Sequence, residues 1–270
     1  MYHVMKRLLV HTLLLLYLCP MSCLSGAFAN KLFRKIWTNE ETGCLRNSRK
    51  DSILSPNSNF VGGDLEQKGM NLFDDAKHLP VTMSREKGNI EVRTSWQGNN
   101  MITIGEAKMV EHHSDEFISF LENFNAAFPK VNSMVRNVVS VKRENGREGV
   151  KSILHFPYPL KDRIMIHYKY LKLNRAQGDH LLIISDEENQ GLLKKFLTSD
   201  DEKKYVLGRT FLCAYWVKPV YCSNNKKVIG SNVKYAFSGD TGGSIPLWIQ
   251  NMIGPKTGLD SVRGLVEYIK

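Results

Sequence analysis

The chain has 270 residues, of which 42% are hydrophobic, and it contains 20 Gly and 9 Pro. This composition excludes collagen-like and low-complexity proteins and leaves enough apolar side chains for a folded core. A formal net charge of +10 at pH 7 predicts attraction to an anionic partner, either nucleic acid or a lipid surface, and carries no information about the fold.

Residues 1–29 have the pattern of a secretory signal peptide. Lys6 and Arg7 precede an apolar run at residues 8–18, and small residues close the segment at Ala29. We therefore expect cleavage after Ala29 and passage into the secretory pathway, for secretion or export. An uncleaved anchor is the alternative, but this run has about half of the ~20 apolar residues that a bilayer-spanning helix needs.

Residues 30–60 form a basic segment with six Lys or Arg, three Asp or Glu and no sustained hydrophobic periodicity. This composition favours a solvated, flexible arm, and a second targeting signal read after the first is the alternative.

Cleavage would leave Cys44, Cys213 and Cys222, which cannot all pair. The sequence leaves open whether Cys213 pairs with Cys222. We expect no zinc site because the chain contains no C-x-x-C spacing.

Residues 61–270 read as one globular domain that begins with a helix and a strand pair. Residues 64–79 carry apolar side chains at helical spacing before Pro80. Residues 90–96 and 101–110 are predicted strands around a Gly-Asn-Asn turn. A second helix is predicted from Ser114, which is expected to cap it.

A series of short strands follows, with no helix predicted between them. The predicted strands are 135–142, 149–156, 164–173, 180–185, 209–217 and 232–238, the first two joined through Asn145-Gly146. Consecutive strands without intervening helices indicate an antiparallel sheet.

The chain closes with a predicted helix. Ser244 is expected to cap it, Pro246 suits its first turn, and apolar residues recur at helical spacing to residue 269. Gly254-Pro255 is expected to break or kink this helix. The order of elements predicts an α+β fold in which a curved antiparallel sheet wraps around a long C-terminal helix.

Two motifs about 80 residues apart resemble those of the START domain, the family related to steroidogenic acute regulatory protein. Residues 156–163, FPYPLKDR, are similar to the family's FPxPxxxR connection. Residues 240–248, DTGGSIPLW, are similar to its DPxGxIPxW turn into the last helix, with Thr241 where the family has Pro. Residues 208–219 fit its penultimate hairpin.

This resemblance implies the helix-grip START fold and an internal hydrophobic tunnel that holds one lipid. The residues it places in the tunnel are Leu154, Phe156, Met165, His167, Lys169, Leu171, Cys213, Trp248 and Met252. It further implies a gate at the last helix, with hinges at Gly242, Gly243, Gly254 and Pro255.

Lys169 is the tunnel residue that most bears on ligand choice. The family often keeps a basic residue at this position, and a lysine here offers a point charge rather than the bidentate fork of arginine. The Arg/Asp pair and aromatic side chains with which family members bind choline are not evident in this sequence. The sequence therefore gives no support for choline recognition by that route.

Other constellations are weaker. SGDTGG at residues 238–243 has Thr where a serine protease of the GDSGG type has its nucleophile. His112 and His113 are adjacent, so on an extended strand they point to opposite faces and do not share a metal ion. Basic residues are not interleaved with aromatics in the manner of a nucleic-acid platform, and we expect no nucleic-acid partner.

The sequence therefore predicts a monomeric, non-enzymatic carrier of one lipid, most simply a phospholipid, with a sterol or sphingolipid as the other ligands. It needs no cofactor or metal, and its basic surface is expected to bind anionic membrane transiently. A cyclase-like enzyme that uses His155 or His167 is one alternative. A lipid sensor that does not transfer its ligand is the other.

Overall fold

The structure is a computed structural model that describes residues 63–85, 89–144, 147–186, 194–223 and 227–269. The expected signal peptide, its cleavage site at Ala29 and the basic arm lie outside these residues.

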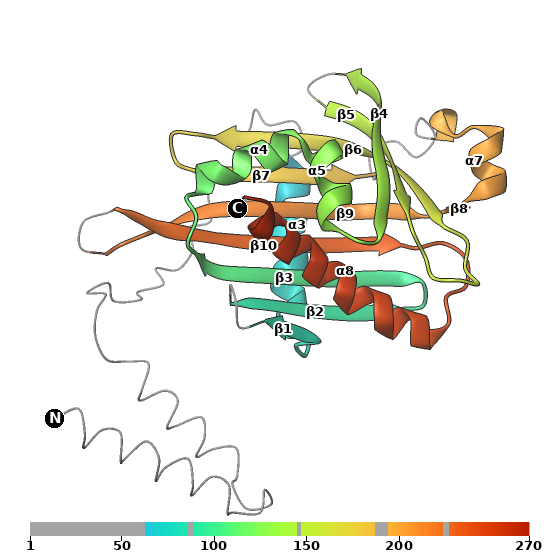
Figure 1. The fold of residues 1–270 in the computed structure, drawn as a ribbon, viewed down its shortest axis with the longest axis horizontal. Helices are drawn as coiled ribbons and strands as arrows, with labels where there is room; N and C mark the ends of the chain where they lie inside the picture. The colour runs from blue at the N-terminus through green and yellow to red at the C-terminus, as the bar shows by residue number, and fades with distance from the viewer. Residues whose placement is uncertain (1–62, 86–88, 145–146, 187–193, 224–226, 270) are drawn as a thin grey trace, which may run out of the picture. The chain divides into compact units, whose positions relative to one another are not determined.

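One curved sheet forms the centre of the fold (Figure 1). Its strands are β1 (Met83–Arg85), β2 (Ile90–Gln97), β3 (Asn100–Val110), β4 (Val135–Glu144), β5 (Arg147–Leu154), β6 (Arg163–Asn174), β7 (Asp179–Ser185), β8 (Val206–Leu207), β9 (Arg209–Tyr221) and β10 (Val228–Asp240). Nine of them follow the order β1-β2-β3-β10-β9-β7-β6-β5-β4, all antiparallel, and β8 pairs in parallel with β6. The predicted antiparallel α+β architecture is confirmed.

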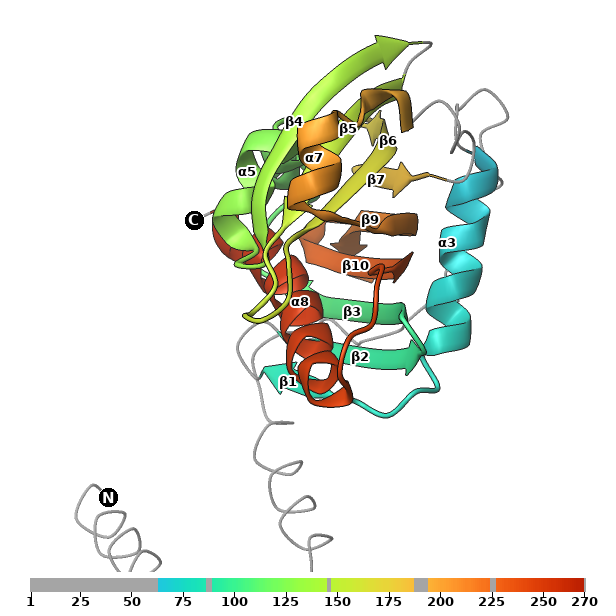
Figure 2. The same cartoon turned by 90° about the vertical axis from the view of Figure 1, so that its right-hand side faces the viewer.

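Helices cover both faces of the sheet. Helix α3 (Gly63–Ala76) lies on one face and α8 (Leu247–Tyr268) crosses the other, as Figure 2 shows in side view. The short helices are η1 (Ser114–Phe117), α4 (Ile118–Glu122), α5 (Phe124–Val131), η2 (Lys194–Phe196) and α7 (Ser199–Lys204). No helix in these described ranges has the length and apolarity needed to span a membrane.

Alternation along the central strands explains why two helices are needed. In β9, Leu212 and Trp216 belong to the apolar cluster that packs under α3. Cys213 and Tyr215 belong to the cluster on the face crossed by α8. Successive side chains of a strand point to opposite faces, so a strand that is apolar throughout must be covered on both.

The helix predicted from Ser114 is divided into η1, α4 and α5. His113, not Ser114, caps its start: the imidazole Nδ1 accepts from the Asp115 backbone N–H at 3.3 Å, and the Glu116 carboxylate accepts from the His113 N–H. Sequence reasoning missed β1, β8 and α7. Each is too short, or in α7 too polar, to show a hydrophobic period.

Helix α8 is continuous through Gly254 and Pro255, so the break that the sequence allowed for is absent. It begins at Leu247 with Pro246 at the cap position, so Ser244 is not its cap. A Cβ on Gly254 would lie 2.8 Å from Trp96 Nε1. Gly254 therefore lets the helix approach β2 closely rather than interrupting it.

The two sequence motifs meet at the buried guanidinium of Arg163. Its Nε donates to the Thr241 carbonyl at 3.2 Å, and Nη2 donates to the Gly242 carbonyl at 3.4 Å. Nη1 donates to the Lys161 carbonyl, and the guanidinium lies 4.2 Å from the centre of the Phe156 ring. Arg163 thus joins the start of β6 to the turn that leads into α8.

We expect Arg163→Met to lower the free energy of unfolding by about 3 kcal/mol or more, since it leaves buried carbonyl groups without donors. Arg136→Met is the matched control. Arg136 is mostly exposed and pairs with Asp162 at 3.0 Å, so its loss should cost less than about 1 kcal/mol. Urea unfolding of the three proteins measures the difference, and equal losses for the two variants would contradict the anchoring role.

Candidate functional site

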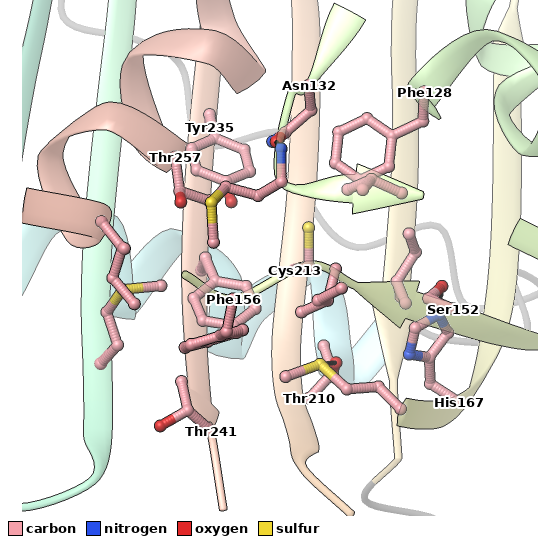
Figure 3. A pocket seen from close by; sticks show the side chains of 18 of the residues that line it. Phe128, Asn132, Ser152, Phe156, His167, Thr210, Cys213, Tyr235, Thr241 and Thr257 are labelled. Atoms are coloured by element: carbon pink, nitrogen blue, oxygen red, sulfur yellow. Dashed lines mark hydrogen bonds between the residues drawn. The ribbon is translucent and has the colours of Figure 1, made fainter. Parts of the chain in front are cut away.

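A cavity of about 70 Å³ lies between the sheet and α8. Its lining residues come from β3 to β6, β7, β9, β10, α5, α8 and the adjoining loops. They are Met101, Phe124, Phe128, Asn132, Met134, Val135, Ser152, Leu154, Phe156, Met165, His167, Ile184, Thr210, Cys213, Tyr235, Phe237, Thr241, Ile253 and Thr257. Figure 3 shows most of these side chains around the opening.

The walls are mainly aliphatic, aromatic and thioether groups. Phe124 and Phe128 of α5 stack with their ring centres 4.5 Å apart and close one side. None of the lining residues in the described part of the chain is an Asp, Glu, Lys or Arg. The cavity is therefore a site for apolar material with a few neutral polar groups at its edge.

His167 and Ser152 form a polar pair on the cavity wall (Figure 3). The Ser152 hydroxyl and His167 Nε2 are 3.2 Å apart, and both side chains are buried. Nδ1 of His167 is buried without a hydrogen-bond partner. Burial lowers the pKa of His167 to about 3, so the imidazole is neutral at physiological pH.

The other titratable cavity groups are neutral as well. Burial raises the pKa of the Cys213 thiol to about 12 and raises that of the Tyr235 phenol well above its ordinary value. Cys213 is free, whereas Cys222 is disulfide-bonded. The two cysteines therefore do not pair with each other, which answers the question that the sequence left open.

Lys169 does not line the cavity, contrary to the prediction. Its ammonium lies 2.6 Å from the Glu148 carboxylate and donates to Asn125 Oδ1 at 3.2 Å. Burial alone would raise the pKa of Glu148, but hydrogen bonds from Lys169 and Ser140 and nearby positive charge outweigh it, and the pKa is lowered. The charge of Lys169 is thus paired with Glu148 on the neighbouring strand β5.

Five of the residues named from the sequence do line the cavity: Leu154, Phe156, Met165, His167 and Cys213. Leu171 instead packs against the apolar core on the same face of the sheet. Trp248 and Met252 are 61% and 46% exposed, because α8 presents Ile253 and Thr257 to the cavity. The predicted helix face was wrong by one residue, or about 100° of rotation.

Several lining residues were missed. Phe124 belongs to the helix predicted from Ser114 but was not expected at the cavity, and Asn132, Thr241 and Thr257 carried no signal of their own. They reach the cavity because a loop end or a helix passes over it. Periodicity within one segment does not contain that information.

The ends of α8 are held by polar contacts. Near its start, Gln250 Nε2 donates to the Gly98 carbonyl at 3.0 Å. Near its end, Asn132 Nδ2 donates to Ser261 Oγ at 3.0 Å, and Ser133 Oγ donates to the Asp260 carboxylate at 2.7 Å.

Of the predicted hinge residues, Gly242 and Gly243 lie in the turn before α8, and Gly254 and Pro255 lie within the helix. Gly242 and Gly243 have φ of 69° and 64°, which glycine adopts without a Cβ clash. At Gly242 a Cβ would also meet the Leu207 carbonyl. The predicted turn is present, and its role as a hinge stays a prediction.

The described residues form no cation site beside the cavity. Within the ranges that the structure describes, no three His, Cys, Asp or Glu side chains converge in a way that could hold a metal ion. His112 contacts Glu116, with 3.0 Å between Nδ1 and Oε2, and His113 acts as the cap described above.

The chain thus combines a curved antiparallel sheet, a C-terminal helix across one face and a small apolar cavity between them. No protein-family model and no curated protein matches the sequence.

Solved structures do match. Human STARD10 is 14% identical over 82% of both chains, with a TM-score of 0.56. Human StAR-related lipid transfer protein 5 is 12% identical over 77% of this chain and 97% of that one, with a TM-score of 0.53. A fragment of a STAR-related lipid transfer protein from Xanthomonas axonopodis is 16% identical over 70% and 97%, with a TM-score of 0.51. The chain has the START fold, as its motifs predicted.

The neutral His167 predicts a pH-dependent stability. The unfolded histidine takes up a proton near pH 6.5 and the folded one only near pH 3, so the unfolded state binds more protons between these values. The free energy of unfolding should therefore fall as pH is lowered through this window, by up to about 1.4 kcal/mol per pH unit from this group.

Urea unfolding at several pH values between 4 and 7 measures that slope for the natural protein and for His167→Gln. In the variant, the free energy of unfolding should depend less steeply on pH, because the proton taken up by unfolded His167 no longer contributes. Identical slopes in the two proteins would show that His167 is not buried in its neutral form.

Proposed function

We propose that this protein binds one lipid in the cavity under α8 and carries it between membranes. The observation that carries the proposal is the apolar cavity, free of charged side chains within the described residues, between the sheet and the last helix. The fold likeness to proteins described as lipid transfer proteins supports it. The lipid is a phospholipid, sterol or sphingolipid, and no cofactor is required.

The protonation states of the cavity favour a carrier over an enzyme. A general base works best with a pKa near the operating pH, and His167, with a pKa of about 3, is a weak one. The Cys213 thiol is protonated and is therefore a poor nucleophile. His155, the other histidine considered for a cyclase-like enzyme, pairs with Asp162 at 2.9 Å and does not line the cavity.

Ligand entry requires the cavity to enlarge. At about 70 Å³ it holds several waters but is smaller than the ~300–1,000 Å³ of sites for drug-sized ligands. Displacing α8 would widen it at the cost of few polar contacts, those of Gln250 and of the Asp260–Ser261 region. Gly242 and Gly243 are the proposed hinge.

The exchange itself is nearly balanced. Burial of each methylene away from water is worth about 0.8 kcal/mol both in the bilayer and in the cavity. The two contributions nearly cancel, so the protein changes the rate of lipid exchange rather than its equilibrium.

The start of α8 is the proposed membrane contact. Leu247, Trp248 and Met252 are exposed there, and large apolar side chains in a group mark an interaction surface. Residues 61–270 hold 29 Lys and Arg against 24 Asp and Glu, a modest excess suited to brief contact with anionic lipid. Transient contact by a monomer would place the gate at the bilayer.

The proposal is tested by transfer of labelled lipid between donor and acceptor vesicles with the full chain. We expect transfer above the spontaneous rate for at least one of phosphatidylcholine, cholesterol or ceramide. Vesicles with and without 20% phosphatidylserine test the anionic contact, which should speed transfer at low salt. Absence of both binding and transfer for all three lipids would refute the proposed function, whereas binding without transfer would identify a sensor.

The double variant Trp248→Ser/Met252→Ser should slow transfer by about tenfold or more, since each side chain would bury apolar area worth ~1.5–3 kcal/mol in the membrane. Its unfolding free energy should change little because both residues are exposed. Val139→Ser, an exposed apolar residue on β4, is the control and should transfer at the natural rate. Equal rates for all three proteins would contradict the placement of the membrane contact.

A further inference from the structure

The Ser152–His167 pair is a buried polar feature of the cavity wall. Ser152 lies on β5 and His167 on the neighbouring strand β6, and both side chains belong to the cavity wall (Figure 3). The imidazole uses Nε2 for the Ser152 hydroxyl and leaves Nδ1 buried without a partner. A buried polar atom without a hydrogen bond is unfavourable, so a ligand atom that supplies one gains affinity.

A neutral imidazole has one donor and one acceptor nitrogen. The serine hydroxyl can serve either role toward Nε2, so Nδ1 is a donor in one tautomer and an acceptor in the other. A ligand hydroxyl both donates and accepts and therefore suits either form. An ether oxygen or an ester carbonyl only accepts and suits one.

The surroundings exclude a charged partner at this position. The cationic side chains of β6, the strand of His167, have partners of their own. Lys169 contacts Glu148 and Asn125, Arg163 donates to three backbone carbonyls, and Lys172 pairs with Glu66. Burial keeps His167 uncharged at neutral pH. A phosphate placed in this cavity would be desolvated without a counter-charge, which is strongly unfavourable.

We propose that the cavity selects an uncharged lipid with a free hydroxyl group, such as a sterol or a diacylglycerol, and that this hydroxyl pairs with His167 Nδ1 beside Ser152. The inference rests on the proposed lipid binding and narrows its ligand from the three classes above. Ser152 is a positioning residue, because it orients the imidazole. His167 is the specificity-determining residue, because it meets the ligand.

The test measures lipid bound to the full chain after incubation with phosphatidylcholine vesicles that contain a trace of one labelled lipid. The labelled lipids are cholesterol, cholesteryl methyl ether, dioleoylglycerol and phosphatidylcholine itself. At equal mole fraction, we expect the protein to bind about tenfold or more cholesterol or dioleoylglycerol than phosphatidylcholine. A factor of this size is the change in binding constant expected for one hydrogen bond. Cholesterol against its methyl ether isolates the hydroxyl without any change to the protein, and cholesterol against dioleoylglycerol identifies the kind of lipid.

His167→Leu should reduce binding of the hydroxylated lipid about tenfold and leave the methyl ether unchanged. Ser152→Ala should reduce it less, because the ring loses its orientation but keeps Nδ1. Lys151→Gln, next to Ser152 on β5 but paired with Asp201 rather than in the cavity, is the control and should bind like the natural protein. Far-UV circular dichroism tests whether each variant is folded. The comparison of cholesterol with its methyl ether uses the natural protein and does not depend on the folding of any variant.

The outcomes separate this inference from the proposed function. Preference for phosphatidylcholine, or equal binding of cholesterol and its methyl ether, overturns the hydroxyl recognition and leaves lipid binding in place. Failure of every lipid to bind overturns the proposed function itself.

Discussion

The contact on which the site most depends is the insertion of the Arg163 guanidinium into the turn between β10 and α8. Burial lowers the pKa of this group and the neighbouring Asp162 carboxylate opposes the shift, so a costly cation is kept inside by donating to backbone carbonyls. The turn it holds contains two glycines with positive φ, and α8 begins a few residues later. One side chain at the start of β6 thus fixes the turn from which α8 begins its path over the cavity.

The cavity is a part of the core in which the side chains of α8 and the sheet leave a space between them. On the face under α8, the apolar cluster includes Val262, Leu265 and Val266 of the C-terminal half of the helix. Gly254 and Gly258 bring the middle of the helix against β2 and β3. The cavity extends along β5, β6 and β9, where the neutral groups Ser152, His167 and Thr210 line it. Charges close to this region are paired, as Glu148 and Lys169 are, so the gap stays apolar. A wall of this kind discriminates ligands by hydrogen bonds and shape rather than by charge.

Sequence reasoning recovered the eight longer strands, the antiparallel character of the sheet and the two motifs because each of these is encoded locally. Alternation marks a strand, proline and glycine mark a turn, and apolar spacing marks α8. It failed where the decisive neighbour is distant in the chain. The inward face of α8 depends on how the helix lies across β2 and β3, so Trp248 and Met252 were placed inside although they are exposed. Lys169 points to the correct side of the sheet, but its partner Glu148 is on another strand, and no pattern within β6 reveals that pair.

The sequence by itself determined the class of fold, five of the nine predicted cavity residues and the absence of a recognisable catalytic motif, since periodicity, turn chemistry and motif spacing are properties of short segments. Only the tertiary structure decided which side chains surround the cavity, that Cys213 is free of Cys222, and that His167 keeps an unpaired nitrogen in an uncharged wall. These features depend on burial and on contacts between residues far apart in the chain. Burial and long-range pairing set the protonation state and polarity of a site, and they exist only once the chain has folded.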